Sequence, residues 1–365
     1  MFSLDSLLDV PPFSLDIAAK RELYMGALAE LTEYHMGRSR EFRQVGQLFG
    51  YRSGCARRIE DFPFIPVRLF KEYELRSVAP AEIVKTMTSS GTTGQAVSRI
   101  FLDRVTATNQ TKVLVKITST ITGGKRLPFL VVDSPAVVKD RNLFSARGAG
   151  LVGFSMLGRD TTYLLTDDYR IDYQALDAFR ARHPSERVLL FGFTFMVWEH
   201  LCEALRRDGK QLDLNGLLLH GGGWKKLASL QIDSAKFRQV VHETTGISQV
   251  VSYYGMVEQT GSIFLECEEG SLHASIFSDI IIREPRTFEP LGPGKTGIVQ
   301  LVSLIPTSYP GHSILTEDLG EILGIDDCPC GKKGTRFRIH GRVPKAELRG
   351  CSDTYAAGRT AEEVQ

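Results

Sequence analysis

Five short apolar runs between residues 128 and 255 decide the fold class: PFLVVD (128–133), TTYLL (161–165), RVLLFGF (187–193), GLLLHGG (216–222) and QVVSYYG (249–255). Amphipathic, helix-like stretches such as residues 195–207 lie between them. Alternation of apolar strand-like runs with helical stretches is typical of parallel βαβ units. We therefore expect an α/β protein with a parallel sheet in this part of the chain.

The segments on either side have different patterns. Apolar residues recur on one helical face before residue 37 and predict a helical N-terminal layer, with Gly37 ending its helix: Leu23, Ala27, Leu31 and Tyr34. The segment FPFIPVRLFKEYEL (62–75) predicts an extended chain that leads into a short helix. From about 270 to 340, short runs broken by Gly and Pro indicate a smaller antiparallel β region.

Composition narrows the class of protein. The 365 residues are 42% hydrophobic, enough to bury one large core or two moderate ones. The net charge is +1, from 44 basic and 43 acidic residues, so the chain lacks the excess of basic residues that is typical of nucleic-acid-binding proteins. The N-terminus has acidic residues and two prolines, and the most apolar run (188–198) is half the length of a membrane span. We expect a soluble, cytoplasmic protein without integral membrane association, whose six cysteines are mostly reduced, metal-bound or reactive rather than disulfide-paired.

The sharpest local signal is a run of seven small residues, five with hydroxyl groups and two glycines: Thr88, Ser89, Ser90, Gly91, Thr92, Thr93 and Gly94. Such a turn can direct backbone N–H groups and hydroxyls at phosphate oxygens, because glycine allows close approach and unusual φ values. It is not a Walker A loop, since no Gly-Lys-Ser/Thr follows. A Ser/Thr-rich surface turn is the alternative on composition alone.

Three weaker signals follow further along the chain. Tyr254, Gly255 and Glu258 come after the run at 249–252, and an aromatic face beside a carboxylate suits a purine and Mg²⁺, although each residue also fits a core aromatic or a solvated acid. The glycines that follow the run at 217–219 could let a flat ring lie against the backbone or form a flexible loop: Gly221, Gly222 and Gly223. Asp318 and Arg342 could hold ribose hydroxyls or be surface charges.

In this order and spacing, the four motifs resemble the ANL superfamily of adenylating enzymes, and within it the LuxE-type acyl-protein synthetase family, with phenylacetate-CoA-ligase-like proteins beside it. The resemblance runs from residue 62 to residue 352. It implies that residues 88–94 grip the β- and γ-phosphates of ATP and that Gly221 and Gly222 lie against adenine. It further implies that Tyr254 stacks on the base, Glu258 binds Mg²⁺, and Asp318 and Arg342 hold the ribose.

The chain departs from the superfamily's pattern in three places. Ala96 and Val97 stand where the phosphate loop usually has Pro-Lys, so Arg99 is the candidate replacement for the lysine. Val257 stands where a threonine is usual, which removes a hydroxyl from the phosphate site. Only residues 343–365 follow Arg342, where most of the superfamily has a mobile lid domain. We expect an adenylation domain over residues 1–340 and a short tail over 341–365 that replaces the lid.

Four residues have the chemistry of a zinc site. Cys267 and His273 lie close in sequence, and Cys328 and Cys330 follow some sixty residues later in CPCGKKG, where Gly331 allows a tight turn. Three thiols and an imidazole suit tetrahedral zinc, and similar pairs hold a structural metal in phenylacetate-CoA-ligase-like proteins. Free thiols are the alternative.

The remaining cysteines divide into two kinds. Cys55 and Cys202 lie among helix-like residues and are expected to be inert packing residues. Cys351 lies in a polar stretch with Lys345 and Arg349 nearby to lower its pKa, and the LuxE-type family carries its acylated cysteine at this position.

The resemblance implies a ligase that converts a carboxylic acid, expected to be a fatty acid, to an acyl-adenylate with MgATP. The acyl group then passes to the Cys351 thiol for delivery to a partner acyl reductase. Two other functions stay open: an acyl- or aryl-CoA ligase that uses coenzyme A directly, and a non-catalytic adenylate-binding subunit, which Val97 and Val257 make conceivable.

Overall fold

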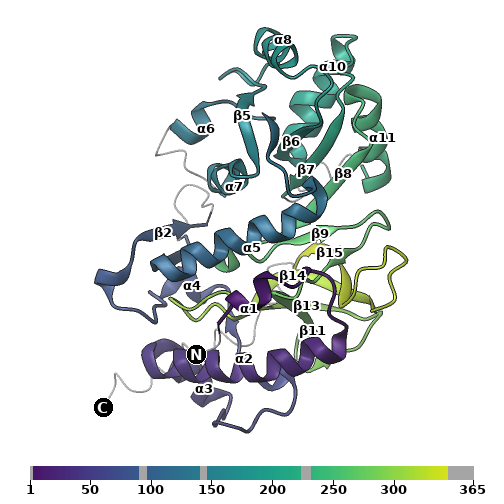
Figure 1. The fold of residues 1–365 in the computed structure, drawn as a ribbon. Coiled ribbons are helices and arrows are strands. Elements are labelled where there is room, and N and C mark those ends of the chain that lie inside the picture. The colour runs from purple at the N-terminus through teal and green to yellow at the C-terminus, as the bar shows by residue number, and fades with distance from the viewer. Residues whose placement is uncertain (1–2, 90–96, 140–145, 223–231, 344–365) are drawn as a thin grey trace. The chain divides into compact units, whose positions relative to one another are not determined.

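The computed structural model describes residues 3–89, 97–139, 146–222 and 232–343. The chain forms two compact units (Figure 1). Unit 1 comprises Met1–Leu114 and Gly255–Gln365, and unit 2 comprises Val115–Tyr254. The boundary near residue 114 lies within the helix α5 (Arg104–Thr122). Each unit has its own group of strands and its own core, as the composition allows.

Unit 2 is built on a parallel sheet with the strand order β5 (Gly158–Tyr163), β4 (Leu127–Val131), β6 (Val188–Phe193), β7 (Gly216–Gly221) and β8 (Gln249–Tyr254). Every neighbouring pair in this order is parallel. β4 is buried at every position and β6 at all but its last, as expected for strands covered on both faces. The five apolar runs of the sequence are these strands.

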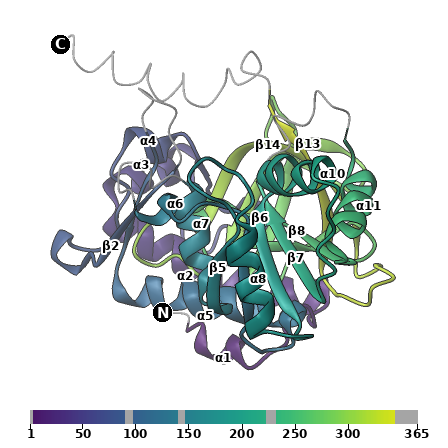
Figure 2. The same ribbon diagram turned by 90° about the horizontal axis from the view of Figure 1, so that it is seen from above.

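Helices cover both faces of the unit 2 sheet. On one face, Leu190 and Leu218 pack against residues of α8 (Tyr173–Arg182), of α10 (Glu203–Arg207) and of α11 (Ser234–Thr245); Figure 2 shows α10 and α11 beside β6 to β8. On the other face, Phe191 contacts Phe154 of α7 (Ala146–Ser155) at a ring distance of 4.9 Å. The helical stretch expected at 195–207 is one continuous helix made of α9 (Thr194–Met196), the π-helical turn η4 (Val197–Cys202) and α10. The short helix α6 (Ala136–Lys139) follows β4.

The sheet of unit 1 is mainly antiparallel, as the broken runs after residue 270 predict. Its strands are β12 (Pro290–Leu291), β11 (Ser278–Arg283), β13 (Thr296–Ser303), β14 (Ser313–Ile325), β15 (Thr335–Arg342), β10 (Leu272–His273) and β9 (Phe264–Glu266), in that spatial order. The short strand β1 (Ile65–Pro66) pairs with β14 in parallel. A separate hairpin of β2 (Lys85–Thr88) and β3 (Arg99–Leu102) carries the Ser/Thr-rich loop.

Unit 1 also contains the helical N-terminal layer: α1 (Asp5–Leu8), α2 (Ile17–Arg38), α3 (Arg40–Leu48), η1 (Ile59–Asp61), α4 (Leu69–Glu72) and η2 (Pro80–Glu82). α2 lies beside β11 (Figure 1), where Lys20 Nζ donates to Ser278 O at 2.9 Å and pairs with Asp279 at 3.2 Å. Both charged side chains are buried, so loss of either one would leave an unpaired charge in the core.

Two sequence expectations about local structure are wrong. Gly37 does not end the first long helix: α2 continues to Arg38, and the extended residue Ser39 both ends it and caps the start of α3 through its hydroxyl. Cys55 does not pack in a helix but is exposed in a loop. Within the described residues, no helix combines the length and the apolar character that crossing a membrane requires.

Candidate functional site

The β2–β3 hairpin holds the two ends of the Ser/Thr-rich loop together. Thr88, the last residue of β2, pairs with Arg99, the first residue of β3. Ser89 N donates to Ser98 O at 3.2 Å, and Ser98 N donates to the Ser89 hydroxyl at 2.9 Å. The rest of the predicted phosphate-binding loop lies outside the described residues: Ser90, Gly91, Thr92, Thr93 and Gly94.

Arg99, the candidate replacement for the usual lysine, has a surface location. Its Nη1 lies 3.0 Å from Glu74 Oε1, and both side chains are more than two-fifths exposed. An exposed pair of this kind adds little stability, about 0 to 1 kcal/mol. Arg99 can therefore exchange this partner for a phosphate at small cost, and its predicted role stays a prediction.

Glu258, the predicted Mg²⁺ ligand, is a buried carboxylate with 5% of its surface exposed. Burial raises its pKa, and the Ser98 hydroxyl, Lys71 and Arg342 act in the opposite direction. The nearby cations favour the ionised form of the carboxyl, which a metal ligand requires. Because this ionised carboxylate is buried, a bound metal cation that offsets its charge would be favourable. The site is thus chemically suited to Mg²⁺, which prefers oxygen ligands.

The turn that carries Glu258 is held from both sides by groups that sequence reasoning missed. In η6 (Val257–Gln259), the Glu258 carbonyl accepts a hydrogen bond from the Tyr309 hydroxyl at 2.8 Å. The amide Nε2 of Gln259 donates to Leu301 O at 3.2 Å and to Gly311 O at 2.8 Å. Nothing in the sequence ties residues 301–311 to residue 258, because the link depends on the antiparallel sheet.

Asp318 and Arg342, the predicted ribose ligands, lie opposite each other in the β14–β15 ladder. Arg342 Nε is 3.9 Å from Asp318 Oδ1, and Arg342 is also within electrostatic reach of Glu258. Of the two ribose candidates, Arg342 is 62% exposed and Asp318 22%. Three predicted ATP ligands thus belong to unit 1: Asp318 and Arg342 form a pair, and Arg342 is within electrostatic reach of Glu258.

In unit 2, the predicted adenine-binding glycines end β7. The Thr194 hydroxyl lies 3.2 Å from both carbonyl oxygens, Gly221 O and Gly222 O, and 3.0 Å from His220 Nδ1. Gly222 has φ +88°, which favours glycine. A Cβ atom on Gly221 would clash with the ring of Tyr253. The space that the glycine leaves is therefore already occupied by an aromatic ring of the protein itself.

Tyr254 and Gly255 follow at the end of β8, as the sequence predicts. Tyr254 is half-buried, and Gly255 is exposed at the start of the next segment. The neighbouring Tyr253 is also half-buried, but its ring packs 4.8 Å from that of Phe154, and burial raises its pKa. The alternation of β8 thus leaves Tyr254 on the opposite face from a packing tyrosine.

The four predicted zinc ligands come together in unit 1. The ligand atoms of Cys267, His273, Cys328 and Cys330 all lie within 4.8 Å of one another. Their meeting is a consequence of sheet pairing, because β10, which contains His273, lies between β9 and β15. The tight turn expected after Cys330 is present: Gly331 has φ +81°, and its N–H donates to Cys328 O at 3.0 Å.

The geometry of the four residues fits a zinc ion. Cys267 Sγ and Cys328 Sγ are 3.9 Å apart, close to the roughly 3.8 Å edge of a tetrahedron with Zn–S bonds of about 2.3 Å. Cys330 Sγ lies 3.5 Å from His273 Nε2. Burial lowers the pKa of His273 to about 4, which keeps the imidazole in its neutral, ligating form. Burial raises the pKa of Cys328 to about 12, so this thiol keeps its proton near neutral pH. A bound metal cation would displace that proton.

The other cysteines differ in their surroundings. Cys202 is fully buried, and burial raises its pKa to about 11, as expected for an inert packing residue. Cys351, the predicted acyl acceptor, lies outside the described residues.

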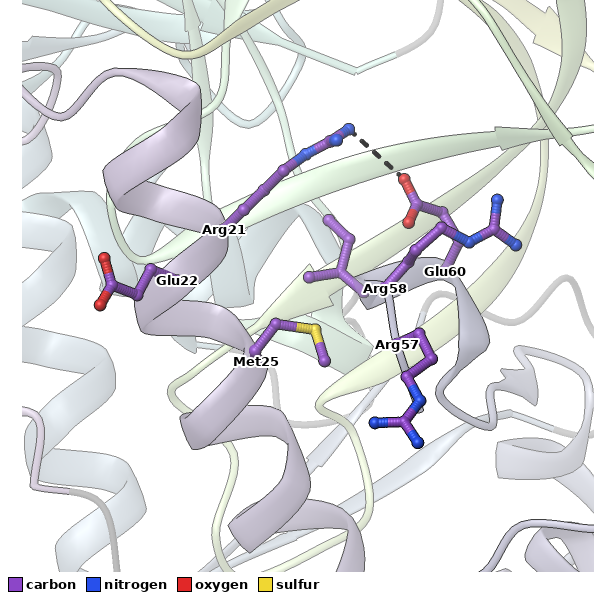
Figure 3. Close-up of a pocket in the computed structure, with 7 residues that line it drawn as sticks. Arg21, Glu22, Met25, Arg57, Arg58 and Glu60 are labelled. Atoms are coloured by element: carbon purple, nitrogen blue, oxygen red, sulfur yellow. Dashed lines mark hydrogen bonds and ion pairs between the residues drawn. The ribbon is translucent and has the colours of Figure 1, made fainter. Parts of the chain in front are cut away.

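A shallow surface pocket of about 180 Å³ lies between α2 and η1 in unit 1 (Figure 3). Arg21 crosses its mouth to Glu60 at 3.5 Å, and Arg58 pairs with Asp61 at 3.0 Å. Charges of both signs line it, and none of the residues predicted to bind ATP or metal is among them. This pocket is therefore not part of the candidate site.

Comparisons with known proteins agree with these motifs. The family model described as "Acyl-protein synthetase, LuxE" matches residues 3–358. Similar curated proteins are the long-chain-fatty-acid–luciferin-component ligases of Aliivibrio fischeri (23% identical, covering 96% of this chain and 93% of the relative) and of Vibrio harveyi (24% identical, 90% and 86%).

Solved structures with a similar fold include 2-hydroxyisobutyryl-CoA ligase in an open conformation with 2-HIB-AMP and CoA (TM-score 0.72, 15% identity, 92% of this chain and 78% of that chain). The same ligase in its thioesterification state has a TM-score of 0.71 at 16% identity, covering 92% and 70%. The chain thus has the fold of this ligase. Because the family model spans almost the whole sequence, the chain belongs to the LuxE family of acyl-protein synthetases.

Proposed function

We propose that this chain activates a long-chain fatty acid with MgATP and transfers the acyl group to a cysteine thiol. The observation that carries the proposal is the grouping of Glu258, Asp318 and Arg342 in one unit of a LuxE-family chain. The acid class comes from the curated relatives, whose names describe long-chain fatty acid ligases.

In the first half-reaction, a carboxylate oxygen of the acid attacks the α-phosphorus of ATP. The bond from that phosphorus to the bridging oxygen breaks, and pyrophosphate leaves along the loop at 88–94. Asp318 and Arg342 hold the ribose, Gly221, Gly222 and Tyr254 contact the adenine, and Arg99 contacts a phosphate. Glu258 would hold Mg²⁺, which would offset negative charge on the phosphate oxygens.

In the second half-reaction, the Cys351 thiolate attacks the acyl carbon, the bond to the AMP oxygen breaks, and AMP leaves. The product is a thioester, which a cytoplasmic acyl reductase partner accepts as its substrate. Adenylate formation needs no thiol, so the two half-reactions can be measured separately.

We also propose that Cys267, His273, Cys328 and Cys330 bind one structural zinc ion. Four protein ligands close a zinc coordination shell, which is typical of structural rather than catalytic zinc. The spacing of the sulfur atoms supports this assignment.

The test of the proposed function is ATP–pyrophosphate exchange, screened over aliphatic acids of graded chain length and aromatic acids. We expect exchange that increases with long aliphatic acids and is lost in Glu258→Gln. A parallel product assay with and without coenzyme A separates the CoA-ligase alternative, which requires an acyl-CoA product. Absence of exchange with every acid would instead favour a non-catalytic adenylate-binding subunit.

A further inference from the structure

The backbone of Ser98 is fixed where the Ser/Thr-rich loop returns to the hairpin. Its N–H donates to the Ser89 hydroxyl at 2.9 Å, and its carbonyl accepts from Ser89 N at 3.2 Å. These two hydrogen bonds close the base of the loop just beyond the Thr88–Arg99 pair of the ladder. Ser98 therefore has a defined position whatever the loop binds.

The side chain of Ser98 is buried without a conventional partner. Its exposed fraction is 0%, and its hydroxyl oxygen forms no hydrogen bond of normal geometry with the described residues. β3, which begins at the next residue, packs against η6. A buried hydroxyl is normally hydrogen-bonded, so this one calls for a functional explanation.

The Ser98 hydroxyl lies beside the carboxyl of Glu258. Burial raises the pKa of this carboxyl, and the Ser98 hydroxyl acts to lower it. The backbone on either side of this carboxyl is already held by Tyr309 and Gln259. What remains free is rotation of the Glu258 side chain. Ser98 can restrict that rotation, since a small movement would give its hydroxyl a carboxylate acceptor.

We propose that Ser98 is a positioning residue for Glu258: its hydroxyl donates to the carboxylate and holds it in the orientation in which it would bind Mg²⁺. The inference rests on the proposed binding of MgATP.

The experiment measures ATP binding by calorimetry and by thermal shift, over a Mg²⁺ titration and in EDTA. For Ser98→Ala we expect about a tenfold higher Mg²⁺ concentration for half-maximal stabilisation, with metal-free ATP binding unchanged. Ser98→Thr keeps the hydroxyl and should stay within about twofold of the parent protein. If threonine does not fit, Ser98→Cys, a weaker donor of similar size, should fall between. Ser303→Ala is the matched control, since Ser303 is also a buried serine, bonded to Ser262 instead.

The outcomes separate this inference from the proposed function. If the parent protein binds MgATP and Ser98→Ala shows the same Mg²⁺ dependence, the role of Ser98 is overturned and the proposed function is not. Equal weakening of ATP binding with and without Mg²⁺ also overturns it, because the effect would not pass through the metal ligand. Parent protein without any Mg²⁺-dependent ATP binding contradicts the proposed function and, with it, the role of Ser98.

Discussion

Asp318 and Arg342 occupy directly paired positions of β14 and β15, with Arg342 Nε 3.9 Å from Asp318 Oδ1. An acid and a base that the sequence offers only as isolated surface charges thus form one polar pair at the edge of the candidate nucleotide site. Arg342 also lies within electrostatic reach of the buried carboxylate of Glu258.

Arg342→Ala is expected to weaken ATP binding about tenfold or more and to change pyrophosphate exchange at saturating ATP much less. The reason is that a ribose contact contributes similarly to the ground state and the transition state. Measuring the exchange rate over a range of ATP concentrations separates the effect on ATP binding from the effect on the rate at saturating ATP. Arg338→Ala is the matched control on the same strand, since Arg338 is similarly exposed and pairs with Glu321. Equal effects of both variants would exclude a specific role for Arg342.

Glu258→Gln is expected to keep the fold and to reduce pyrophosphate exchange about a hundredfold or more. The amide has nearly the same size but binds Mg²⁺ weakly, so charge on the phosphates is no longer offset. Glu321→Gln, which changes an acid paired with Arg338, serves as the control. Near-normal exchange in Glu258→Gln would show that the metal ligand lies elsewhere.

The zinc proposal predicts about one zinc ion per chain in protein purified without added metal or chelator. Cys328→Ser should lower the melting temperature more than it changes the specific activity of the folded fraction, whereas Cys55→Ser, in an exposed loop, should change neither. Metal analysis that finds no zinc contradicts the proposal.

Loss of zinc should also have a local effect, because the N-terminal segment is hydrogen-bonded to the loop that contains Cys328 and Cys330. Phe13 O accepts from Lys333 N at 3.0 Å, and Asp326 accepts from both Ile17 N and Gly334 N, at 2.9 and 2.6 Å. Removal of zinc should therefore speed hydrogen exchange in residues 11–20 and leave the strands of unit 2 unchanged. Uniform change over both units would indicate global destabilisation instead.

Stability should fall as the pH is lowered from 6.5, because three histidines outside the proposed zinc site are buried in the uncharged form. Burial lowers the pKa of His35 and His220 to about 3 and that of His312 well below its usual value. A histidine whose pKa is lowered in the folded state contributes its full stability above the unfolded pKa of about 6.5. This contribution is lost as the pH falls toward the pKa of the folded state. Each histidine should cost about 1 to 2 kcal/mol between pH 6.5 and 5, where most carboxylates stay ionised.

Urea unfolding at pH 7, 6 and 5 measures this loss. His312→Gln should be less stable than the parent at pH 7, since it loses the stacking on His35, but its stability should fall less steeply with pH. A parent protein whose unfolding free energy is constant from pH 7 to 5 would contradict the assignment.

Sequence patterns predicted the fold of this chain well where local periodicity decides it. The runs at 187–193 and 216–222 became the buried strands β6 and β7, because apolar runs bounded by glycine and helical stretches have few other solutions. Gly37 was misjudged because an interior glycine is tolerated when the helix packs, and the hydroxyl of Ser39 is the actual boundary signal.

The candidate site was predictable only in part. Motif spacing pointed to Glu258 and to the four zinc ligands, but not to Ser98 or Tyr309. Both residues reach Glu258 through tertiary packing over long sequence separations, and a lone serine or tyrosine has no local pattern that marks it. The clash that a side chain at Gly221 would make with Tyr253 was equally invisible, since it depends on the register of β7 and β8.

The central claim is that the chain forms an acyl-adenylate and then a thioester on Cys351, and one paired measurement on Cys351→Ala tests it most directly. Labelled fatty acid and MgATP are given to the parent, to Cys351→Ala and to Cys55→Ser, and both pyrophosphate exchange and hydroxylamine-labile acyl-protein are measured. The account predicts that all three proteins exchange pyrophosphate and that only Cys351→Ala fails to form the labile acyl-protein, because the thioester requires the sulfur. Labelling of Cys351→Ala as strong as that of the parent would contradict it.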